Sequence, residues 1–373
     1  MTKLSFEPSK SFSKGSRAAI FVPSLGGGGA ERVMVIVANE LAKLGVSIDV
    51  LLAQKAGPYL DELNPQVNVV DLRAKRVLGA VIPLMRYLRE NKPSVMLSAL
   101  THANIAAVIA QTISATSTRV VVSERGSETL SAATNGRLSS RIYGLVKRVA
   151  YRRADAIVAV SRGLAGALAS DLRIDASRVQ TIYNPLDLDM ISSQAARDVD
   201  HPWIMNPSFK TYLAVGRLSE VKQYDHLLKA FSSICGKFAA KLIILGDGPL
   251  RDELVRTAQD LGIDEHVDFV GFQPNPYAWM AKCDVYVLSS SSEGLPNSLM
   301  QAMACGARIV STDCTYGPSE ILQDGRWGTL VPVGDIQALA DALAYCAFQD
   351  DPPPVKERAR DYEAAGIARQ YAE

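Results

Sequence analysis

Two hydrogen-bonding side chains, Glu293 and Gln301, stand eight residues apart in the second half of the chain. An apolar stretch at 284–288 and a run of serines at 289–292 come before them. This order predicts a strand, then a loop that carries the acid, then a helix that carries the amide. Because ligands of open α/β sheets bind outside the carboxyl ends of the strands, the pattern indicates a binding site at this loop.

The start of the predicted helix offers a partner for phosphate. Its first backbone N–H groups would be those of Asn297, Ser298 and Leu299. Such groups point outward, and the helix dipole favours negative charge beside them. Glu293 and Gln301 could then hold hydroxyl groups on either side of the phosphate. A nucleotide sugar presents that order of groups, with sugar hydroxyls, a diphosphate and ribose hydroxyls.

Two cations follow another predicted strand, at 212–215. Arg217 comes after Gly216, and Lys222 follows five residues later. The guanidinium of an arginine can donate two parallel hydrogen bonds, and a lysine acts as a compact charge. Together, across a strand–helix turn, they can bind a diphosphate. The alternative is a pair of solvated surface charges, but their place at the carboxyl end of a strand favours binding. The sequence Gly-Asp-Gly-Pro at 246–249 predicts a neighbouring turn at the end of a strand.

A third candidate is the glycine-rich segment at 24–32, which includes Gly28 and Gly29. A glycine turn between strand and helix lets backbone N–H groups approach a phosphate closely. The segment lacks the G-x-G-x-x-G order and the lysine of a P-loop, so a merely flexible loop is the competing interpretation.

Alternating strand and helix patterns position these motifs. One run extends from a buried strand at 17–23 to a strand at 179–182, and it includes a helix at 30–44 that Gly45 should close. A polar segment at 191–209 indicates a linker, after which the alternation restarts. Such alternation predicts an α/β protein with parallel sheets, made of two Rossmann-like domains that face a cleft.

We expect four segments along the chain. They are a flexible lead at 1–16, an N-terminal Rossmann-like domain at 17–195, a C-terminal Rossmann-like domain at 196–354, and a last helical segment at 355–373.

The bulk properties are those of a globular protein with unevenly spread charge. The first 200 residues hold 25 Lys and Arg against 17 Asp and Glu, and the remainder holds 15 against 22. Five scattered cysteines without C-x-x-C spacing indicate reduced thiols rather than disulfides or a zinc site. The polar N-terminus is not a signal peptide, and no apolar run reaches the ~18 residues of a spanning helix. We therefore expect a cytoplasmic protein.

Four motifs form a specific combination along the chain. In order, they are Gly-Gly-Ala-Glu at 28–31, Gly-Arg-Leu…Lys at 216–222, Gly-Asp-Gly-Pro at 246–249 and Glu-Gly-Leu-Pro-Asn-Ser-Leu…Gln-Ala-Met-Ala-Cys-Gly at 293–306. The chain resembles the retaining, nucleotide-sugar-dependent glycosyltransferases of family 4, which have the GT-B fold. The resemblance extends from about residue 18 to 371. It implies that the domain at 17–195 lies on the acceptor side, that the domain at 196–354 binds the nucleotide sugar, and that the helix at 355–373 crosses back to the N-terminal domain.

The resemblance implies roles for the matching positions. Arg217 and Lys222 match the pair that neutralises the donor diphosphate, and Glu293 matches the first acid of the Glu-x7-Glu motif, which touches the donor sugar. We assign these three as catalytic. The residues expected at the donor site are Gly28, Gly29, Gly216, Gly246, Phe272, Gln273, Gly294, Leu295, Pro296, Asn297, Ser298, Leu299 and Gln301.

The chain departs from the family pattern at two places. The second acid of Glu-x7-Glu, which binds the ribose hydroxyls in the family, is replaced by Gln301 here. An amide can still donate hydrogen bonds to hydroxyls and accept hydrogen bonds from them. The histidine that many relatives carry in the N-terminal half is missing from 121–126. His102 could face the cleft instead or cap a helix. On the acceptor side we expect His102, Asn104, Glu124 and Arg125.

Two stretches of the basic half mix cations with apolar residues, at 73–92 and 137–153. Basic amphipathic helices can lie on an anionic membrane surface. Alternatively, the apolar face packs on the sheet and the basic face is solvated.

The resemblance implies a retaining glycosyltransferase that moves a hexosyl or N-acetylhexosaminyl group from a UDP-sugar to a glycan acceptor in cell-surface polysaccharide or glycoconjugate synthesis. By the same resemblance we expect the acceptor to be a glycan or a polyprenyl-linked glycan. The alternatives are a UDP-sugar 2-epimerase on the same fold and a non-catalytic two-lobed sugar-binding protein. We expect no metal and no other cofactor, because the two cations take the metal's place. We expect no nucleic acid partner, because the basic residues lack interleaved aromatics. The protein could be peripheral on the inner face of the cell membrane.

Overall fold

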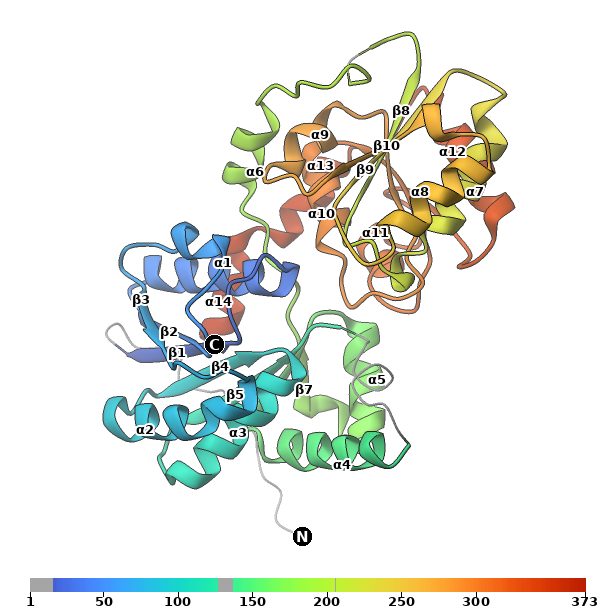
Figure 1. The fold of residues 1–373 in the computed structure, drawn as a ribbon. Coiled ribbons are helices and arrows are strands. Elements are labelled where there is room, and N and C mark those ends of the chain that lie inside the picture. Colours follow the sequence, from blue (N-terminus) through green and yellow to red (C-terminus); the bar gives the residue numbers. More distant parts are fainter. Residues whose placement is uncertain (1–15, 127–136, 205) are drawn as a thin grey trace. The chain divides into compact units, whose positions relative to one another are not determined.

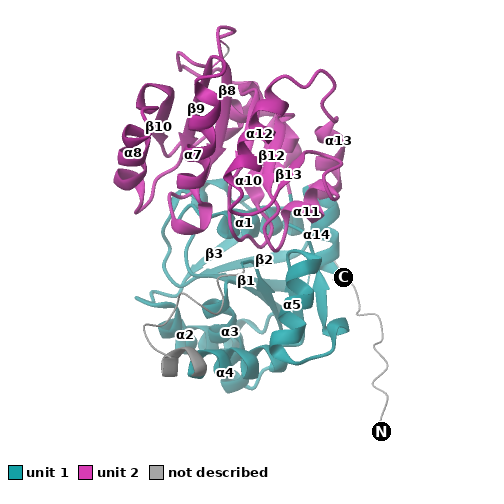
Figure 2. Cartoon of the chain, turned by 90° about the vertical axis from the view of Figure 1, so that its right-hand side faces the viewer, with its two compact units in different colours: residues 1–185, 364–373 teal, residues 186–363 magenta. Residues whose placement is uncertain are grey.

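The computed structural model describes residues 16–126, 137–204 and 206–373, and for 137–141 it describes the backbone alone. The chain divides into two compact units (Figure 2). Unit 1 consists of residues 1–185 and 364–373, and unit 2 consists of residues 186–363. Of the predicted lead at 1–16, only Ser16 lies within the described residues.

Unit 1 contains a parallel sheet of seven strands in the order β3-β2-β1-β4-β5-β6-β7. The strands are β1 (Arg17–Val22), β2 (Ser47–Leu52), β3 (Asn68–Asp71), β4 (Val95–Ala99), β5 (Arg119–Glu124), β6 (Ala156–Ala159) and β7 (Val179–Thr181). All five residues of β4 are buried, as expected of a central parallel strand covered on both faces.

Two groups of helices cover this sheet, on opposite faces (Figure 1). The helices are α1 (Gly29–Lys43), α2 (Val81–Asn91), α3 (Thr101–Ser114), α4 (Arg137–Arg153), α5 (Arg162–Leu172) and α14 (Ala364–Ala372), with 3-10 turns η1 (Pro58–Glu62), η2 (Val77–Ala80) and η3 (Ala176–Arg178). Helices α1 and α14 pack together, whereas α3 packs against α2 and α4.

The prediction for α1 is confirmed. Its apolar stripe, Val33, Val37 and Leu41, is buried, and each such side chain contributes about 1.5–3 kcal/mol. Gly45 follows the helix with a φ of +84°, a left-handed conformation that costs glycine little.

Unit 2 contains a parallel sheet of six strands in the order β10-β9-β8-β11-β12-β13. The strands are β8 (Lys210–Val215), β9 (Ala240–Leu245), β10 (Val267–Gly271), β11 (Val285–Leu288), β12 (Arg308–Thr312) and β13 (Thr329–Val331). In both sheets the order of strands reverses beside the unit's first strand, which is the Rossmann-like arrangement. The predicted α/β class with two such sheets is confirmed.

Helices cover this sheet in two groups as well. The helices are α6 (Leu188–Ala195), α7 (Tyr224–Cys235), α8 (Arg251–Asp260), α9 (Pro276–Lys282), α10 (Asn297–Cys305), α11 (Pro318–Leu322), α12 (Ile336–Ala347) and α13 (Val355–Ala359), with 3-10 turns η4 (Glu220–Lys222), η5 (Asp264–His266) and η6 (Arg360–Tyr362). Helix α7 packs against α12, and α10 packs against α6, α9 and α13. The main core of the unit lies between the sheet and the α7–α12 pair.

The structure departs from the predicted segments in two places. Residues 191–195, expected in a linker, belong to α6, which packs against α9 and α10, so the division falls after residue 185 rather than 195. The predicted final helix at 355–373 is interrupted at Glu363, where the backbone is extended and the N–H of Leu186 donates to the carbonyl of Tyr362 (2.7 Å). Only residues 364–373 belong to unit 1.

Candidate active site

The predicted catalytic residues follow two neighbouring strands of unit 2. Arg217 and Lys222 follow β8, and Glu293 follows β11. These strands are adjacent in the sheet although more than 60 residues separate them in the chain. They form the switch point of the strand order, where open α/β sheets bind their ligands. The fold therefore brings these loops together at the expected place.

Lys222 and Glu293 form an ion pair at this switch point. The Nζ atom of Lys222 lies 2.6 Å from Oε1 of Glu293. The hydroxyl of Ser290 donates to the same carboxylate oxygen at 2.7 Å. The side chains of Lys222 and Glu293 are 19% and 14% exposed, so water screens the pair only weakly. The arrangement fixes one cation and one carboxylate in a partly desolvated position.

The serines before Glu293 tie the two loops to each other. The hydroxyl of Ser289 donates to the carbonyl of Lys222 at 2.7 Å. The N–H of Ser291 donates to the carbonyl of Val221 at 2.8 Å, and its hydroxyl donates to the same oxygen at 3.1 Å. These bonds satisfy the carbonyls of η4 and set the position of the lysine. This role of the serines was not predicted, although a run of hydroxyl side chains at the end of a strand indicates local hydrogen bonding to the backbone.

Arg217 remains open to an anion. Its side chain is exposed, and its guanidinium has no hydrogen-bond or ion-pair partner in the described part of the chain. An arginine whose five donors are unused can bind phosphate oxygens in a bidentate manner.

Glycines allow the backbone to pass closely beneath these side chains. Gly246 has a φ of +133°, and a Cβ atom there would lie 2.0 Å from the carbonyl oxygen of Gly216. A Cβ atom at Gly248 would lie 2.3 Å from the carbonyl oxygen of Leu218. The turn after β9 must therefore be glycine-rich for the β8 loop to lie against it.

Helix α10 begins at the predicted phosphate partner, Asn297. Its N-cap residue is Pro296, whose side chain makes no capping hydrogen bond. Gln301 lies in the second turn and is half-buried, and its Nε2 atom lies 3.5 Å from the hydroxyl of Tyr277 on α9. Tyr277 was not predicted, because nothing in the sequence connects it with Gln301.

The remaining donor-side residues of the second half lie near these elements. Phe272 directly follows β10, and 63% of its side chain is exposed. Gln273 beside it is half-buried. Gly294, Leu295 and Pro296 are buried before α10. An exposed aromatic ring at a strand end offers a flat apolar face to a nucleobase.

In unit 1, the glycine-rich loop lies between β1 and α1. Gly28 and Gly29 are exposed, and Gly29 begins the helix. The hydroxyl of Tyr59 donates to the carbonyl of Gly27 at 2.9 Å, which anchors the loop at one point. The exposed N–H end of α1 has the chemistry of an anion site.

His102 lies at the beginning of α3 and is exposed. Partial desolvation lowers the pKa of its imidazole, while the charges of Glu31 and Glu124 oppose that shift. Exposure leaves it accessible to an acceptor.

Asn104 and Glu124 are instead buried in a polar network, 0% and 2% exposed. Glu124 accepts hydrogen bonds from Tyr151 (2.7 Å) and Thr101 (3.1 Å), and its Oε2 atom lies 3.3 Å from Nζ of Lys147. Asn104 donates to the hydroxyl of Tyr151 at 2.8 Å. The predicted acceptor contact is contradicted for these two residues, because their polar groups are satisfied inside the unit.

Arg125 connects three elements of unit 1. Its guanidinium donates to Asn184, after β7, at 2.8 Å and to the hydroxyl of Tyr371 on α14 at 2.9 Å. It therefore fixes the last helix rather than standing free for an acceptor.

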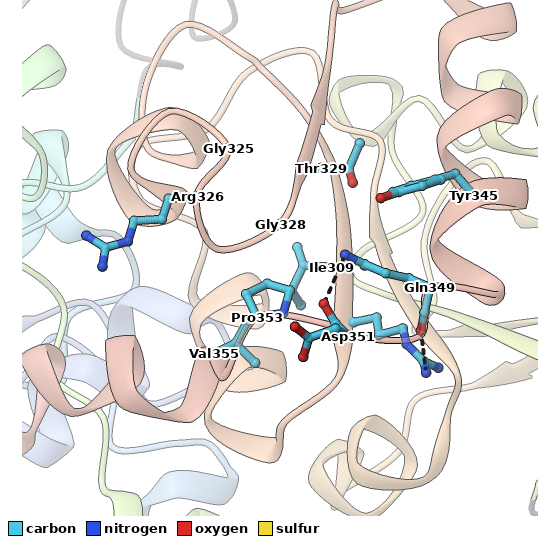
Figure 3. Close-up of a pocket in the computed structure, with 11 residues that line it drawn as sticks. Ile309, Gly325, Arg326, Gly328, Thr329, Tyr345, Gln349, Asp351, Pro353 and Val355 are labelled. Atoms are coloured by element: carbon cyan, nitrogen blue, oxygen red, sulfur yellow. Dashed lines mark hydrogen bonds between the residues drawn. The ribbon is translucent and has the colours of Figure 1, made fainter.

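A separate pocket of about 300 Å³ lies at the edge of the unit 2 sheet (Figure 3). Arg308 and Thr329 line it at the amino ends of β12 and β13, and Arg326 points away from the other side chains drawn. Arg308 donates to the carbonyl of Gln349 at 3.2 Å. Because ligands of such sheets bind at carboxyl ends, this pocket is distinct from the candidate active site.

Within the described residues, no group of three or more His, Cys, Asp or Glu side chains is placed to hold a metal ion. In the same part of the chain, no helix has both the length and the apolar character that crossing a membrane requires.

Comparisons with known families account for most of the chain. Residues 27–190 match the model described as Glycosyltransferase Family 4. Residues 202–365 match the model described as Glycosyl transferases group 1. Each match falls mainly within one of the two units.

Two curated relatives come from Campylobacter jejuni subsp. jejuni serotype O:2. One is N-acetylgalactosamine-N,N'-diacetylbacillosaminyl-diphospho-undecaprenol 4-alpha-N-acetylgalactosaminyltransferase, 29% identical over 95% of this chain and 97% of the relative. The other is GalNAc-alpha-(1->4)-GalNAc-alpha-(1->3)-diNAcBac-PP-undecaprenol alpha-1,4-N-acetyl-D-galactosaminyltransferase, 27% identical over 95% and 97%.

Among solved structures, the chain is similar to HepE of Anabaena, which was crystallised in complex with UDP. The TM-score is 0.75 and the identity 20%, and the match covers 96% of this chain and 98% of the HepE chain. At this identity the likeness shows the fold.

Proposed function

We propose that this chain, which belongs to the family 4 glycosyltransferases and has the GT-B fold, moves one sugar from a UDP-sugar to a polyprenyl-linked glycan. The observation that carries the donor part is the Lys222–Glu293 pair at the β8–β11 switch point, with Arg217 open beside it in the same loop. A cation pair and a carboxylate match a diphosphate that is attached to a hydroxyl-rich sugar.

Transfer requires stabilisation of the leaving nucleoside diphosphate. Negative charge develops on the phosphate oxygen as the glycosidic bond breaks, and donors fixed in advance stabilise that charge. Lys222 is held in place by Glu293 and by the serine that bonds its carbonyl. Arg217 and the beginning of α10 supply further positive potential. Glu293 can in addition accept a hydrogen bond from a sugar hydroxyl through its second oxygen.

The nucleotide in this proposal is UDP. HepE, which has the same fold, was crystallised with UDP. In this chain, the exposed ring of Phe272 after β10 can cover the base, and the half-buried Gln301, whose Nε2 atom lies against the buried hydroxyl of Tyr277, can meet the ribose hydroxyls. Transfer proceeds with retention of the anomeric configuration, as in the glycosyltransferases that the sequence resembles, and without a metal, because the two cations carry the required charge.

The acceptor in this proposal is a glycan on a polyprenyl diphosphate. Both Campylobacter relatives are named for undecaprenol-linked glycans, and each match covers nearly the whole of both chains. In this proposal His102, which is exposed at the beginning of α3, contacts the acceptor. Such an acceptor would bring the protein to the cytoplasmic face of a membrane as a peripheral enzyme.

A transfer assay tests this proposal. The protein is incubated with UDP-glucose, UDP-GlcNAc or UDP-GalNAc and with undecaprenyl-diphosphate-linked glycans in detergent, with and without EDTA. We expect one donor to yield a product one sugar longer in the presence of EDTA, with the anomeric coupling of the donor retained by NMR. An inverted product, or turnover that EDTA abolishes, would contradict the proposed mechanism.

A further inference from the structure

Helix α4 presents apolar side chains to solvent and polar ones to the protein. Ile142, Leu145, Val146 and Val149 are 56%, 59%, 40% and 42% exposed. Their spacing of three and four residues places them on one helical face. We refer to these four residues as the α4 stripe. A surface helix of a globular protein normally has the opposite arrangement.

Buried polar groups hold the helix in this orientation. Lys147 is 2% exposed and pairs with Glu124 at 3.3 Å. Tyr151, one turn later, is fully buried, and its hydroxyl donates to Glu124 at 2.7 Å. Rotation of the helix to bury the α4 stripe would pull Lys147 and Tyr151 away from a buried carboxylate, which is costly. The exposure of the stripe is therefore built into the fold. Of the two alternatives from the sequence, the one with the apolar face packed on the sheet and the basic face solvated is wrong, because the α4 stripe is exposed and Lys147 is buried.

Positive charge accompanies the stripe. Helix α4 contains six Lys and Arg and no Asp or Glu. Arg153 is exposed one turn beyond Val149, and its guanidinium has no partner among the described residues. Arg148 and Arg152 instead donate to the carbonyls of Asp171 and Leu172 at the end of α5.

A second element of unit 1 has the same composition. Leu78 and Ile82, on η2 and α2, are 62% and 59% exposed. The exposed cations Lys75 and Arg76 come directly before them. Helix α3 packs against η2, α2 and α4, so both apolar surfaces belong to one cluster of helices (Figure 1).

We propose that the α4 stripe inserts into the headgroup region of an anionic lipid bilayer, an inference that rests on the proposed function because a polyprenyl-linked acceptor lies in such a bilayer. The apolar side chains enter the boundary between headgroups and acyl chains, and Arg153 meets the lipid phosphates. A second copy of this chain would have to bring its own charge of the same sign to the same helix, and the lack of acidic residues on α4 disfavours that contact.

Vesicle flotation tests the inference. The full chain is mixed with vesicles of phosphatidylcholine alone, or with vesicles that also contain about 30% phosphatidylglycerol. The ionic strength is about 0.15 M, close to the physiological value. We expect flotation with the anionic vesicles, at least tenfold weaker for Ile142→Ser/Leu145→Ser/Val149→Ser. Arg153→Ala should weaken it about fivefold. Leu44→Ser, which changes another exposed apolar residue of unit 1 (45% exposed), is the matched control and should float like the wild type.

Two further measurements separate the possible failures. Calorimetric titration with UDP should give the same affinity for the triple variant as for the wild type, because α4 belongs to unit 1 and the proposed diphosphate contacts belong to unit 2. Loss of UDP binding in the wild type would contradict the proposed function and leave the vesicle result unaffected. Equal flotation of the triple variant and the wild type would overturn the α4 proposal. The α4 proposal would also be overturned if the wild type formed dimers in sedimentation experiments and the same three substitutions dissociated them.

Discussion

The ammonium group of Lys222 lies 2.6 Å from the carboxylate of Glu293, although 71 residues separate them. The contact exists because β8 and β11 are neighbours at the switch point of the unit 2 sheet. Each of the two side chains is the ion-pair partner of the other. Binding of a diphosphate would add a second anion on Lys222 and leave Glu293 an oxygen for the sugar.

Removal of the lysine charge should affect the chemical step most. We expect Lys222→Met to lower kcat by about 10²–10³, since a fixed donor to a developing oxyanion is worth ~2.7–4 kcal/mol. Glu293→Gln should lower kcat about 10–100-fold through loss of a charged hydrogen bond. Steady-state kinetics on both single variants and on the double variant give the coupling free energy between the two side chains. Strictly additive effects would show that the pair does not act as a unit.

The Glu124–Lys147 pair should be important for stability. Lys147→Met leaves an uncompensated buried carboxylate, at a cost of about 3–5 kcal/mol. The double variant Glu124→Gln/Lys147→Met should recover much of that loss, because neither buried charge remains. Urea unfolding followed by circular dichroism measures both. If the double variant is less stable than Lys147→Met, the pair is not the reason for the loss.

The bond from Arg125 to Tyr371 should hold α14 on unit 1. We expect Tyr371→Phe to weaken this attachment by about 1.5–3 kcal/mol, because a hydrogen bond to a charged donor is lost. Hydrogen exchange of residues 364–372 should become at least tenfold faster, whereas exchange in α10 should not change. Unaltered exchange in α14 would indicate that its packing against α1 suffices.

The cysteines of unit 2 should be unreactive in the folded protein. Burial raises the pKa of Cys305 and of Cys314 to about 12, and the charge of Glu293 adds to the effect at Cys314. At pH 8 the reactive thiolate is therefore scarce, and raising the pH toward 12 should restore it. We expect iodoacetamide to modify Cys305 and Cys314 at least a hundredfold more slowly in the folded protein than in the protein unfolded in urea, as measured by peptide mass spectrometry. Rapid native labelling at pH 8 would contradict this assignment.

The local motifs could be predicted from the sequence better than the contacts between them. Arg217, Lys222 and Glu293 were predictable because each follows an apolar run that reads as a strand, and parallel strands present their ends at one edge. Burial of Glu124 was not predictable, because its partner Lys147 reads as one more cation of a basic helix. The break at Glu363 was missed for a similar reason, since it depends on a backbone bond to distant Leu186.

In the proposed function, Arg217 and Lys222 bind the diphosphate of UDP without a metal. Calorimetric titration of the wild type with UDP, GDP and ADP in EDTA tests it most directly. We expect UDP to bind in preference to GDP and ADP. Its affinity should be at least tenfold weaker in Arg217→Ala and unchanged in Arg256→Ala, which changes an exposed arginine of α8. No binding of UDP, or equal affinity in Arg217→Ala and the wild type, would contradict it.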